Sequence, residues 1–255
     1  MAAVNIDIII LSFAKDENTT ALTLQTIDTL VQSEDPDKVK FNVVIIESNK
    51  ALKPHQFEHT QTLYPEEKFG FNKYLNIGIN ATSNKYICLC NNDLVFHPGW
   101  AGAFLDYIKE LNTDDFVLSP FCELSHPHFS DLPKPVEGYW GYFAGHCFFT
   151  TRSALKKIGP LDEKINFWYA DNDFLNILQR EHIPHYFVRK SWVTHLKSQI
   201  ASNFNRLQRL RYNSYPRIYF RYKWEDHSRL LYLWRSGIYL SKYVVASAMS
   251  LFTKE

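Results

Sequence analysis

Cysteine is scarce in this sequence, and its arrangement excludes the usual cysteine frameworks. The four cysteines, Cys88, Cys90, Cys122 and Cys147, include no CxxC pair of the kind that binds zinc or carries redox chemistry. With 255 residues, 45% of them hydrophobic, the chain can bury a core that needs no disulfide to stabilise it. We therefore expect reduced thiols and a cytoplasmic protein.

Long apolar runs are missing too. The apolar residues 6–11 follow no basic segment and are too few and too β-branched for a signal peptide. The longest apolar stretch near the C-terminus, residues 243–252, falls well short of the ~20 residues that span a bilayer. We expect a protein that is not exported and does not cross a membrane, although it can touch one.

The sequence also lacks internal repeats, low-complexity tracts and a glycine-rich basic loop after its first predicted strand. Such a loop would cradle a triphosphate, so its absence argues against a sugar nucleotidyltransferase.

Positive charge is concentrated at the C-terminal end, although the net charge is only +1. Residues 201–255 hold ten Lys and Arg against three Asp and Glu, and they are rich in Tyr and Trp. Such a segment suits an anionic surface, either phospholipid or nucleic acid. We predict a catalytic domain over residues 1–200 and a basic, aromatic, helical extension over residues 201–255.

Apolar residues follow the periods of alternating strands and helices. Strands are predicted at residues 6–11, 41–46, 86–90 and 146–150, and near residues 185–188 and 192–194. Helices are predicted over residues 20–32, 70–81, 100–111 and 171–180. The alternation predicts an α/β/α fold with a mostly parallel central sheet.

Two segments depart from this alternation. Residues 119–140 carry four prolines and no sustained period, which predicts a long loop. In the extension, we expect helices that are interrupted at Pro216.

Three polar signals lie where such a fold places its ligands. Asn91, Asn92 and Asp93 follow a buried strand, and ligands of open α/β sheets bind beyond the carboxyl ends of strands. An aromatic loop delivers Asp171 to the start of a helix, and His195 ends a later strand. Each signal has a structural alternative: turn chemistry for Asn-Asp, helix capping for the acidic loop, and a buried structural imidazole for His195.

The order and spacing of these features resemble the inverting family 2 glycosyltransferases of GT-A fold, especially their rhamnosyltransferase-like bacterial branch, over about residues 5–197. The residues that carry the resemblance are Ser12-Phe13, Glu47-Ser48, Gly70-Phe71 with Asn76 and Gly78-Ile79, Asn91–Asp93, Gly145 to Arg152, Gly159 to Glu163, Ala170–Asp173 and His195. Two positions depart from the family pattern, because Ala170 replaces the usual acid before the base and Asn91 replaces the first Asp of the metal motif.

The resemblance implies roles for these residues. The nucleotide would contact Ser12, Phe13, Glu47, Asn76, Asn91 and Asn92. Asp93 and His195 would bind Mn²⁺ or Mg²⁺ at the donor diphosphate, and Asp171 would act as general base in a single inverting displacement. Trp140, Trp168, Tyr169 and Asp173 would contact the acceptor or the sugar, although aromatic residues also serve as ordinary core packing.

We predict a hexosyl- or deoxyhexosyltransferase of bacterial surface polysaccharide or glycan synthesis, with a dTDP- or UDP-linked donor and a glycan or lipid-linked acceptor. The basic extension would bring it to the inner face of the membrane. The departures at Ala170 and Asn91 also suit a non-catalytic nucleotide-sugar-binding or scaffolding protein. Nucleic-acid binding through the extension is a further alternative, against which the acidic character of residues 1–200 counts, since they hold 18 Lys and Arg and 24 Asp and Glu.

Overall fold

The computed structural model describes residues 2–129, 134–196 and 204–252. Within them, one nine-stranded mixed sheet runs in the order β3-β2-β1-β4-β8-β6-β9-β5, with β7 paired to β9. The strands are β1 (Val4–Ser12), β2 (Val39–Glu47), β3 (Gln61–Leu63), β4 (Tyr86–Asn91), β5 (Leu94–Phe96), β6 (Val117–Phe121), β7 (Val136–Glu137), β8 (Cys147–Thr151) and β9 (His185–His195).

One half of the sheet is parallel, and its strands end together. β1 pairs with both β2 and β4 in parallel, so that Ser12 lies opposite Glu47 and Leu11 opposite Asn91. These strands are apolar on both faces because helices cover both sides of the sheet. The polar residues that terminate β1, β2 and β4 are therefore gathered at one edge.

The other half of the sheet brings distant segments to that edge. β8 is antiparallel to β4, with Cys147 opposite Cys90, and this register places His146 next to the end of β4. β5 is antiparallel to β9, with Leu94 opposite His195. The sheet is consequently more mixed than the sequence predicted, and its antiparallel pairs decide which residues meet.

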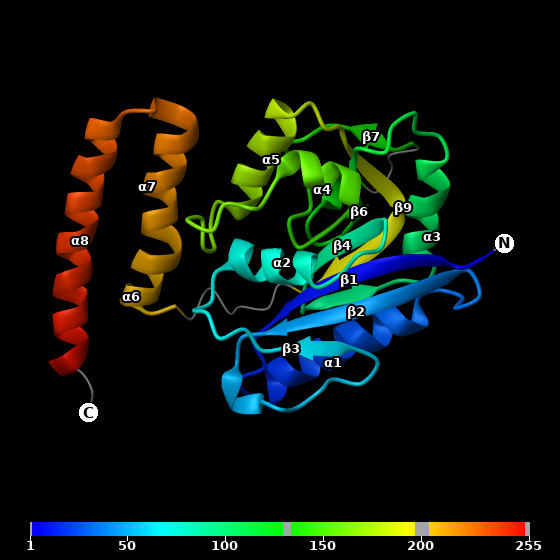
Figure 1. Ribbon diagram of the computed structural model, residues 1–255, viewed down its shortest axis with the longest axis horizontal. Helices are drawn as coiled ribbons and strands as arrows, with labels where there is room; N and C mark the ends of the chain where they lie inside the picture. The colour runs from blue at the N-terminus through cyan, green and yellow to red at the C-terminus, as the bar shows by residue number, and fades with distance from the viewer. Residues whose placement is uncertain (1, 130–133, 197–203, 253–255) are drawn as a thin grey trace.

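Helices cover both faces of the sheet, as Figure 1 shows. The α1 helix (Glu17–Gln32) and α3 (Trp100–Ile108) pack on one face, and α2 (Phe71–Asn80), α4 (Arg152–Ile158) and α5 (Ala170–Arg180) pack on the other. A Cβ at Gly78 would overlap the Ile9 side chain, so this glycine allows α2 to lie directly on β1. The predicted α/β/α fold is confirmed.

Residues 119–140 are less irregular than predicted. Residues 119–121 belong to β6, a 3-10 turn spans Pro127–Phe129, and β7 pairs with β9. Pro120 is accommodated because the register between β6 and β9 shifts at the step from Pro120 to Phe121.

The C-terminal segment forms a helical hairpin beside the body (Figure 1). Its first arm runs through α6 (Arg206–Arg209), a π-helical turn, α7 (Tyr215–Arg221) and a second π-helical turn, and its second arm is α8 (Arg229–Phe252). The predicted break at Pro216 is wrong, because the arm stays helical through Pro216, which lies in the first turn of α7 directly after the π-helical turn Leu210–Ser214. The chain reverses instead at His227, which has a φ of 50°.

The predicted domain boundary near residue 200 lies outside the described residues. None of the described helices combines the length and the apolar character needed to span a bilayer.

Candidate active site

A cavity of about 410 Å³ opens at the edge where β1 and β4 end. We call it the sheet-edge cavity. Its wall includes six residues that the sequence predicted as part of the site, Ser12, Phe13, Asn91, Asn92, Asp93 and His195. The sheet topology therefore assembles residues that are up to 183 positions apart.

Two of these polar side chains are held in place from α1. Asn92 Nδ2 donates a 2.8 Å hydrogen bond to Thr23 Oγ1, and Thr23 Oγ1 lies 3.1 Å from Ser12 Oγ. All three residues are buried. Their geometry is consequently fixed by the helix that follows β1, which leaves little freedom for the cavity wall to rearrange.

Asp93 and His195 are direct neighbours. Asp93 follows β4, His195 ends β9, and the pairing of β5 with β9 brings Asp93 Oδ1 to 3.2 Å from His195 Nε2. The imidazole also stacks on His146, with ring centroids 4.4 Å apart and planes inclined by 10°. A carboxylate and an oriented imidazole are thus presented together, and His146, which the sequence did not single out, supports the imidazole.

This donor pair, one carboxylate oxygen and one imidazole nitrogen, fits a divalent cation that accepts both oxygen and nitrogen ligands. Two ligand atoms at right angles on one ion, each with a bond of ~2.1 Å, are separated by about 3 Å, close to the 3.2 Å observed. Carboxylate oxygen suits Mg²⁺ and Mn²⁺, and the remaining positions suit phosphate oxygens and water. The cysteine cluster of Cys88, Cys90 and Cys147 lies buried in the core instead and offers only soft ligands.

A second cavity of about 500 Å³ adjoins the first. We call it the Asp171 cavity, because Asp171 lies in its wall together with Trp168 and Tyr169. The two cavities share Asn91 and His195 in their linings, as well as Phe71 and Phe167. Because His195 lines both cavities, the Asp93–His195 pair lies at the boundary between the sheet-edge cavity and the Asp171 cavity.

Asp171 occupies the first turn of α5 with unusual surroundings. Its side chain is accessible from the cavity, yet the protein atoms crowded around the carboxylate remove hydration and raise its pKa to about 6, while His195 acts in the opposite direction. A Cβ added at Gly145 would overlap this carboxylate, so Asp171 packs directly on a glycine backbone. A carboxyl with a pKa near neutrality is suited to accept a proton.

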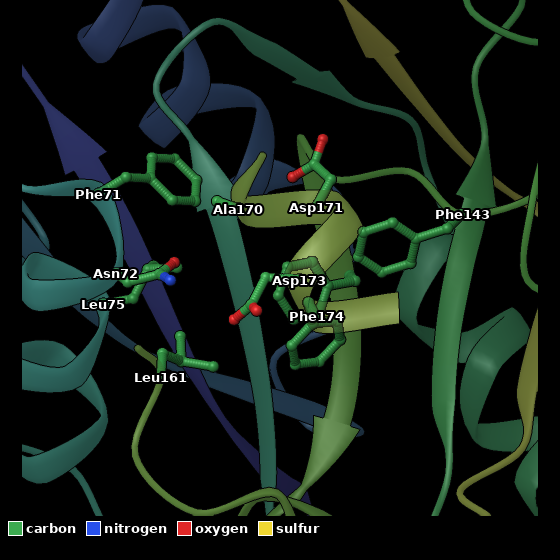
Figure 2. A pocket seen from close by; sticks show the side chains of 10 residues that line it. Phe71, Asn72, Leu75, Phe143, Leu161, Ala170, Asp171, Asp173 and Phe174 are labelled. Carbon is green, nitrogen blue, oxygen red and sulfur yellow. The ribbon is translucent and has the colours of Figure 1, made fainter. Parts of the chain in front are cut away.

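Asp173 has a different environment from Asp171. Figure 2 shows the two side chains leaving the first turn of α5 in different directions. Asp173 is buried, and its Oδ1 accepts a 2.6 Å hydrogen bond from Trp224 Nε1 and lies 2.8 Å from Lys223 Nζ. Its carboxylate is thus bound by the C-terminal segment and lines neither large cavity, and its expected sugar contact stays a prediction.

Three more of the predicted site residues lie outside both cavities. The buried carboxylate of Glu47 accepts backbone N–H groups of Ala14 and Asn49, with Asn49 N at 2.6 Å. Asn76 uses its amide on Leu161, donating to the carbonyl at 2.9 Å and accepting from the N–H at 3.0 Å. These two side chains stabilise loops near the site, and the half-exposed Trp140 lines neither cavity.

The sequence reasoning missed the contribution of the C-terminal segment. Phe204, Gln208 and Tyr212 line the sheet-edge cavity. The aromatic rings of Phe204 and Tyr212 pack on Phe167, with centroids 5.6 and 5.8 Å apart. Charge patterning could not locate these contacts, since it describes the segment as a whole and not the surface on which it docks.

A polar cavity beyond the carboxyl ends of parallel strands is where open α/β sheets bind their ligands. The chain belongs to glycosyl transferase family 2, whose model matches residues 18–159. A comparison with curated protein sequences finds no match.

Solved structures with similar folds carry nucleotides and metal. The chain resembles GalNAc-T7, crystallised with UDP, GalNAc and Mn²⁺, with a TM-score of 0.61 at 13% identity over 76% of this chain and 44% of that one. It also resembles the mannosyltransferase PcManGT from Pyrobaculum calidifontis with GDP-Man and Mn²⁺, with a TM-score of 0.59 at 12% identity over 100% of this chain and 77% of that one. A Drosophila β1,4-galactosyltransferase 7 catalytic domain with xylobiose gives a TM-score of 0.53 at 12% identity, with 80% and 75% covered. At these identities the likeness establishes the GT-A fold, and the chain spans less than half of GalNAc-T7.

Proposed function

We propose that this protein is a metal-dependent, inverting glycosyltransferase that moves one hexosyl or deoxyhexosyl unit from a nucleotide-diphosphate sugar to an acceptor hydroxyl. The observation that carries the proposal is the pair of adjoining cavities. One is walled by Asp93 and His195 and the other by Asp171, and both share His195. A transferase needs such a division, since donor and acceptor must meet at one carbon.

The sheet-edge cavity takes the donor. Its wall includes Ser12, Phe13, Asn91 and Asn92. These residues offer a hydroxyl group, an exposed aromatic ring and two amide groups to a nucleoside. Asp93 and His195 would hold Mn²⁺ or Mg²⁺, which supplies stabilisation of the negative charge that develops on the leaving diphosphate. The rhamnosyltransferase-like motifs favour a dTDP- or UDP-linked donor.

The Asp171 cavity takes the acceptor. Trp168 and Tyr169 offer apolar ring faces to the C–H surfaces of a sugar. Asp171 accepts the proton of the acceptor hydroxyl, whose oxygen forms a bond to the anomeric carbon as the bond from that carbon to the diphosphate oxygen breaks. The electron pair of the broken bond leaves with the nucleoside diphosphate, and the configuration inverts. Because the pKa of Asp171 is about 6, the carboxylate is ionised at neutral pH and remains a usable base.

The donor assignment is tested by thermal unfolding with UDP, dTDP and GDP, each with and without Mn²⁺, and with CMP as control. A ligand at 100 times its dissociation constant adds ~2.7 kcal/mol, which raises the midpoint by about 5–10 °C in a chain of this size. We expect a metal-dependent shift with one diphosphate, which also identifies the base. If no diphosphate shifts the midpoint, the proposed function is refuted.

We also propose that α8 contacts the membrane, so that the enzyme works at its cytoplasmic face on a lipid-linked acceptor in surface polysaccharide or glycan synthesis. The outer surface of α8 exposes large apolar side chains, including Leu230 at 81% and Trp234 at 64% exposure. The helix contains Arg229, Arg235 and Lys242 and no acidic residue, and Arg235 is paired with Asp226. The charges of Arg229 and Lys242 favour anionic lipid, and they disfavour the packing of a second α8 against this one.

Flotation with anionic and zwitterionic vesicles tests this contact. We expect binding to anionic vesicles that Leu233→Glu weakens, because the charge would enter the apolar surface. Leu124→Glu on the body is the matched control, since Leu233 is 56% and Leu124 52% exposed. Equal flotation of both variants and the unmodified protein, or no flotation of any of them, would contradict the proposal.

A further inference from the structure

Side chains of the C-terminal segment bind two aspartates of the body, Asp162 and Asp173, which lie before and after the proposed base in the sequence. Lys223 Nζ lies 2.8 Å from Asp173 Oδ1 and 2.9 Å from Asp162 Oδ2. Tyr219 OH donates a 3.0 Å hydrogen bond to the same oxygen of Asp162. One lysine thus connects the first turn of α5 with the loop that follows α4.

Burial makes this contact energetically important. The Asp173 side chain is 2% exposed and the side chains of Lys223 and Asp162 are each 21% exposed. A buried carboxylate without a partner is strongly unfavourable, so removing Lys223 would leave a poorly compensated charge at Asp173. Burial raises the pKa of Asp173, and Lys223 and Trp224 oppose that rise. Without its partners, Asp173 would lose hydration without compensation.

The first turn of α5 lacks the stabilisation that a helix start ordinarily has. Its N-cap is Tyr169, which has a φ of 70° in the left-handed region and makes no side-chain capping hydrogen bond. Trp224 Nε1 and Lys223 bind Asp173 within this turn, and the Phe220 ring packs on Tyr169 at a centroid distance of 5.2 Å. The C-terminal segment therefore anchors, through side-chain contacts, a turn that no capping side chain stabilises.

The same segment also holds the loop that leads into this turn. Trp168 N donates a 3.1 Å hydrogen bond to the Tyr212 carbonyl. Contacts with the C-terminal segment thus fix the chain on both sides of Asp171, at the loop residue Trp168 before it and at the Asp173 side chain after it.

We propose that Lys223 and Trp224 are positioning residues of the active site: by holding Asp173, they fix the turn of α5 that presents Asp171 to the acceptor. The inference rests on the proposed function, because it assigns the C-terminal segment a part in that reaction. The segment would then be required for turnover independently of any membrane contact. A misplacement of a catalytic group by about 1 Å can reduce the rate by 10²-fold.

The test compares Lys223→Met with Lys38→Met, a matched control that removes a lysine paired with an aspartate, Asp35 at 3.1 Å, on the exposed surface of the body. We expect Lys223→Met to lower kcat by about 10–100-fold while the nucleoside diphosphate and Mn²⁺ still raise the unfolding midpoint, since Lys223 does not line the sheet-edge cavity. Lys38→Met should leave kcat unchanged. In Asp173→Asn/Lys223→Met, the uncompensated charge is gone and the amide can still accept from Trp224, so kcat should partly recover.

Hydrogen exchange supplies a readout that does not depend on turnover. Lys223→Met should speed amide exchange in residues 170–174, and Lys38→Met should not. Unchanged exchange there, or a Lys223→Met enzyme with the kcat of the unmodified protein, would overturn the positioning role. Absence of turnover in the unmodified protein with every donor would refute the proposed function instead, and faster exchange in Lys223→Met would still support the structural contact.

Discussion

Gly145→Ala tests the proposed base without adding or removing a polar group. Gly145 lies in the loop before β8, and a Cβ at this position would overlap the Asp171 carboxylate. Its φ is not in the left-handed region, so the backbone itself tolerates alanine. The perturbation is therefore steric and local to one side chain.

The magnitude follows from the distance that Asp171 must move. Restoring ordinary contact between the new methyl group and the carboxylate requires a shift of about 1 Å or more. A displacement of that size can reduce kcat by about 10²-fold, which corresponds to about 2.7 kcal/mol of transition-state stabilisation. Donor binding should persist, because Gly145 does not line the sheet-edge cavity.

The assay is nucleoside diphosphate release at saturating donor and Mn²⁺, with thermal unfolding as a measure of folding and donor binding. Gly237→Ala is the matched control, since no atom lies within 4 Å of the position a Cβ would take. It should leave turnover unchanged and stabilise α8 slightly, because alanine favours a helix more than glycine does. Wild-type turnover in Gly145→Ala would refute the assignment of Asp171 as base.

Three further predictions concern single side chains. First, kcat should fall about tenfold per pH unit below about 6, because protonation of Asp171, whose pKa is about 6, removes the base; a profile flat from pH 8 to pH 5 would exclude this carboxyl. This pKa lies above the value of an unfolded Asp, so ionisation of Asp171 lowers the stability of the fold as the pH rises through 6. In a thermal scan at pH 8, Asp171→Asn should therefore unfold at no lower temperature than the unmodified protein. The same variant should lose about 10²–10⁴-fold in rate. Second, Asp93→Asn should abolish the Mn²⁺ dependence of the diphosphate-induced shift in unfolding midpoint, and an intact dependence would remove Asp93 from the metal site. Third, Asn76→Ala should lower stability by about 1 kcal/mol or more in urea unfolding, because two part-buried hydrogen bonds to Leu161 are lost, with diphosphate binding retained; a selective loss of binding would instead support a nucleotide contact by Asn76.

Local sequence patterns predicted most of the elements because the relevant forces are local. The apolar runs that became β1, β2 and β4 and the helical periods of α1, α2 and α5 were placed within a few residues of their observed bounds. The predictions failed where a tertiary contact outweighed the local signal. Pro120 belongs to β6 through its pairing with β9, and Pro216 lies inside a helical arm.

Side-chain roles were harder to predict than elements. Asn76 and Glu47 stand at the motif positions of a nucleotide site, but nearby backbone groups bind their polar atoms. Asp173 differs from Asp171 by two positions, and on a helix that rotation turns one carboxylate toward a cavity and the other toward the C-terminal segment.

The sequence by itself determined the class of fold and the residues from which a site could be built. These features depend on residues that are neighbours in the sequence: the strand periodicity, the abrupt strand ends and the acidic or amide residues that follow them. Only the tertiary structure decided which of these residues meet. The register of β5 with β9 joins Asp93 to His195 across about a hundred residues, and the docking of Lys223 on Asp173 brings the C-terminal segment into the site. Such contacts depend on the summed packing of the whole chain, which no local window of sequence contains.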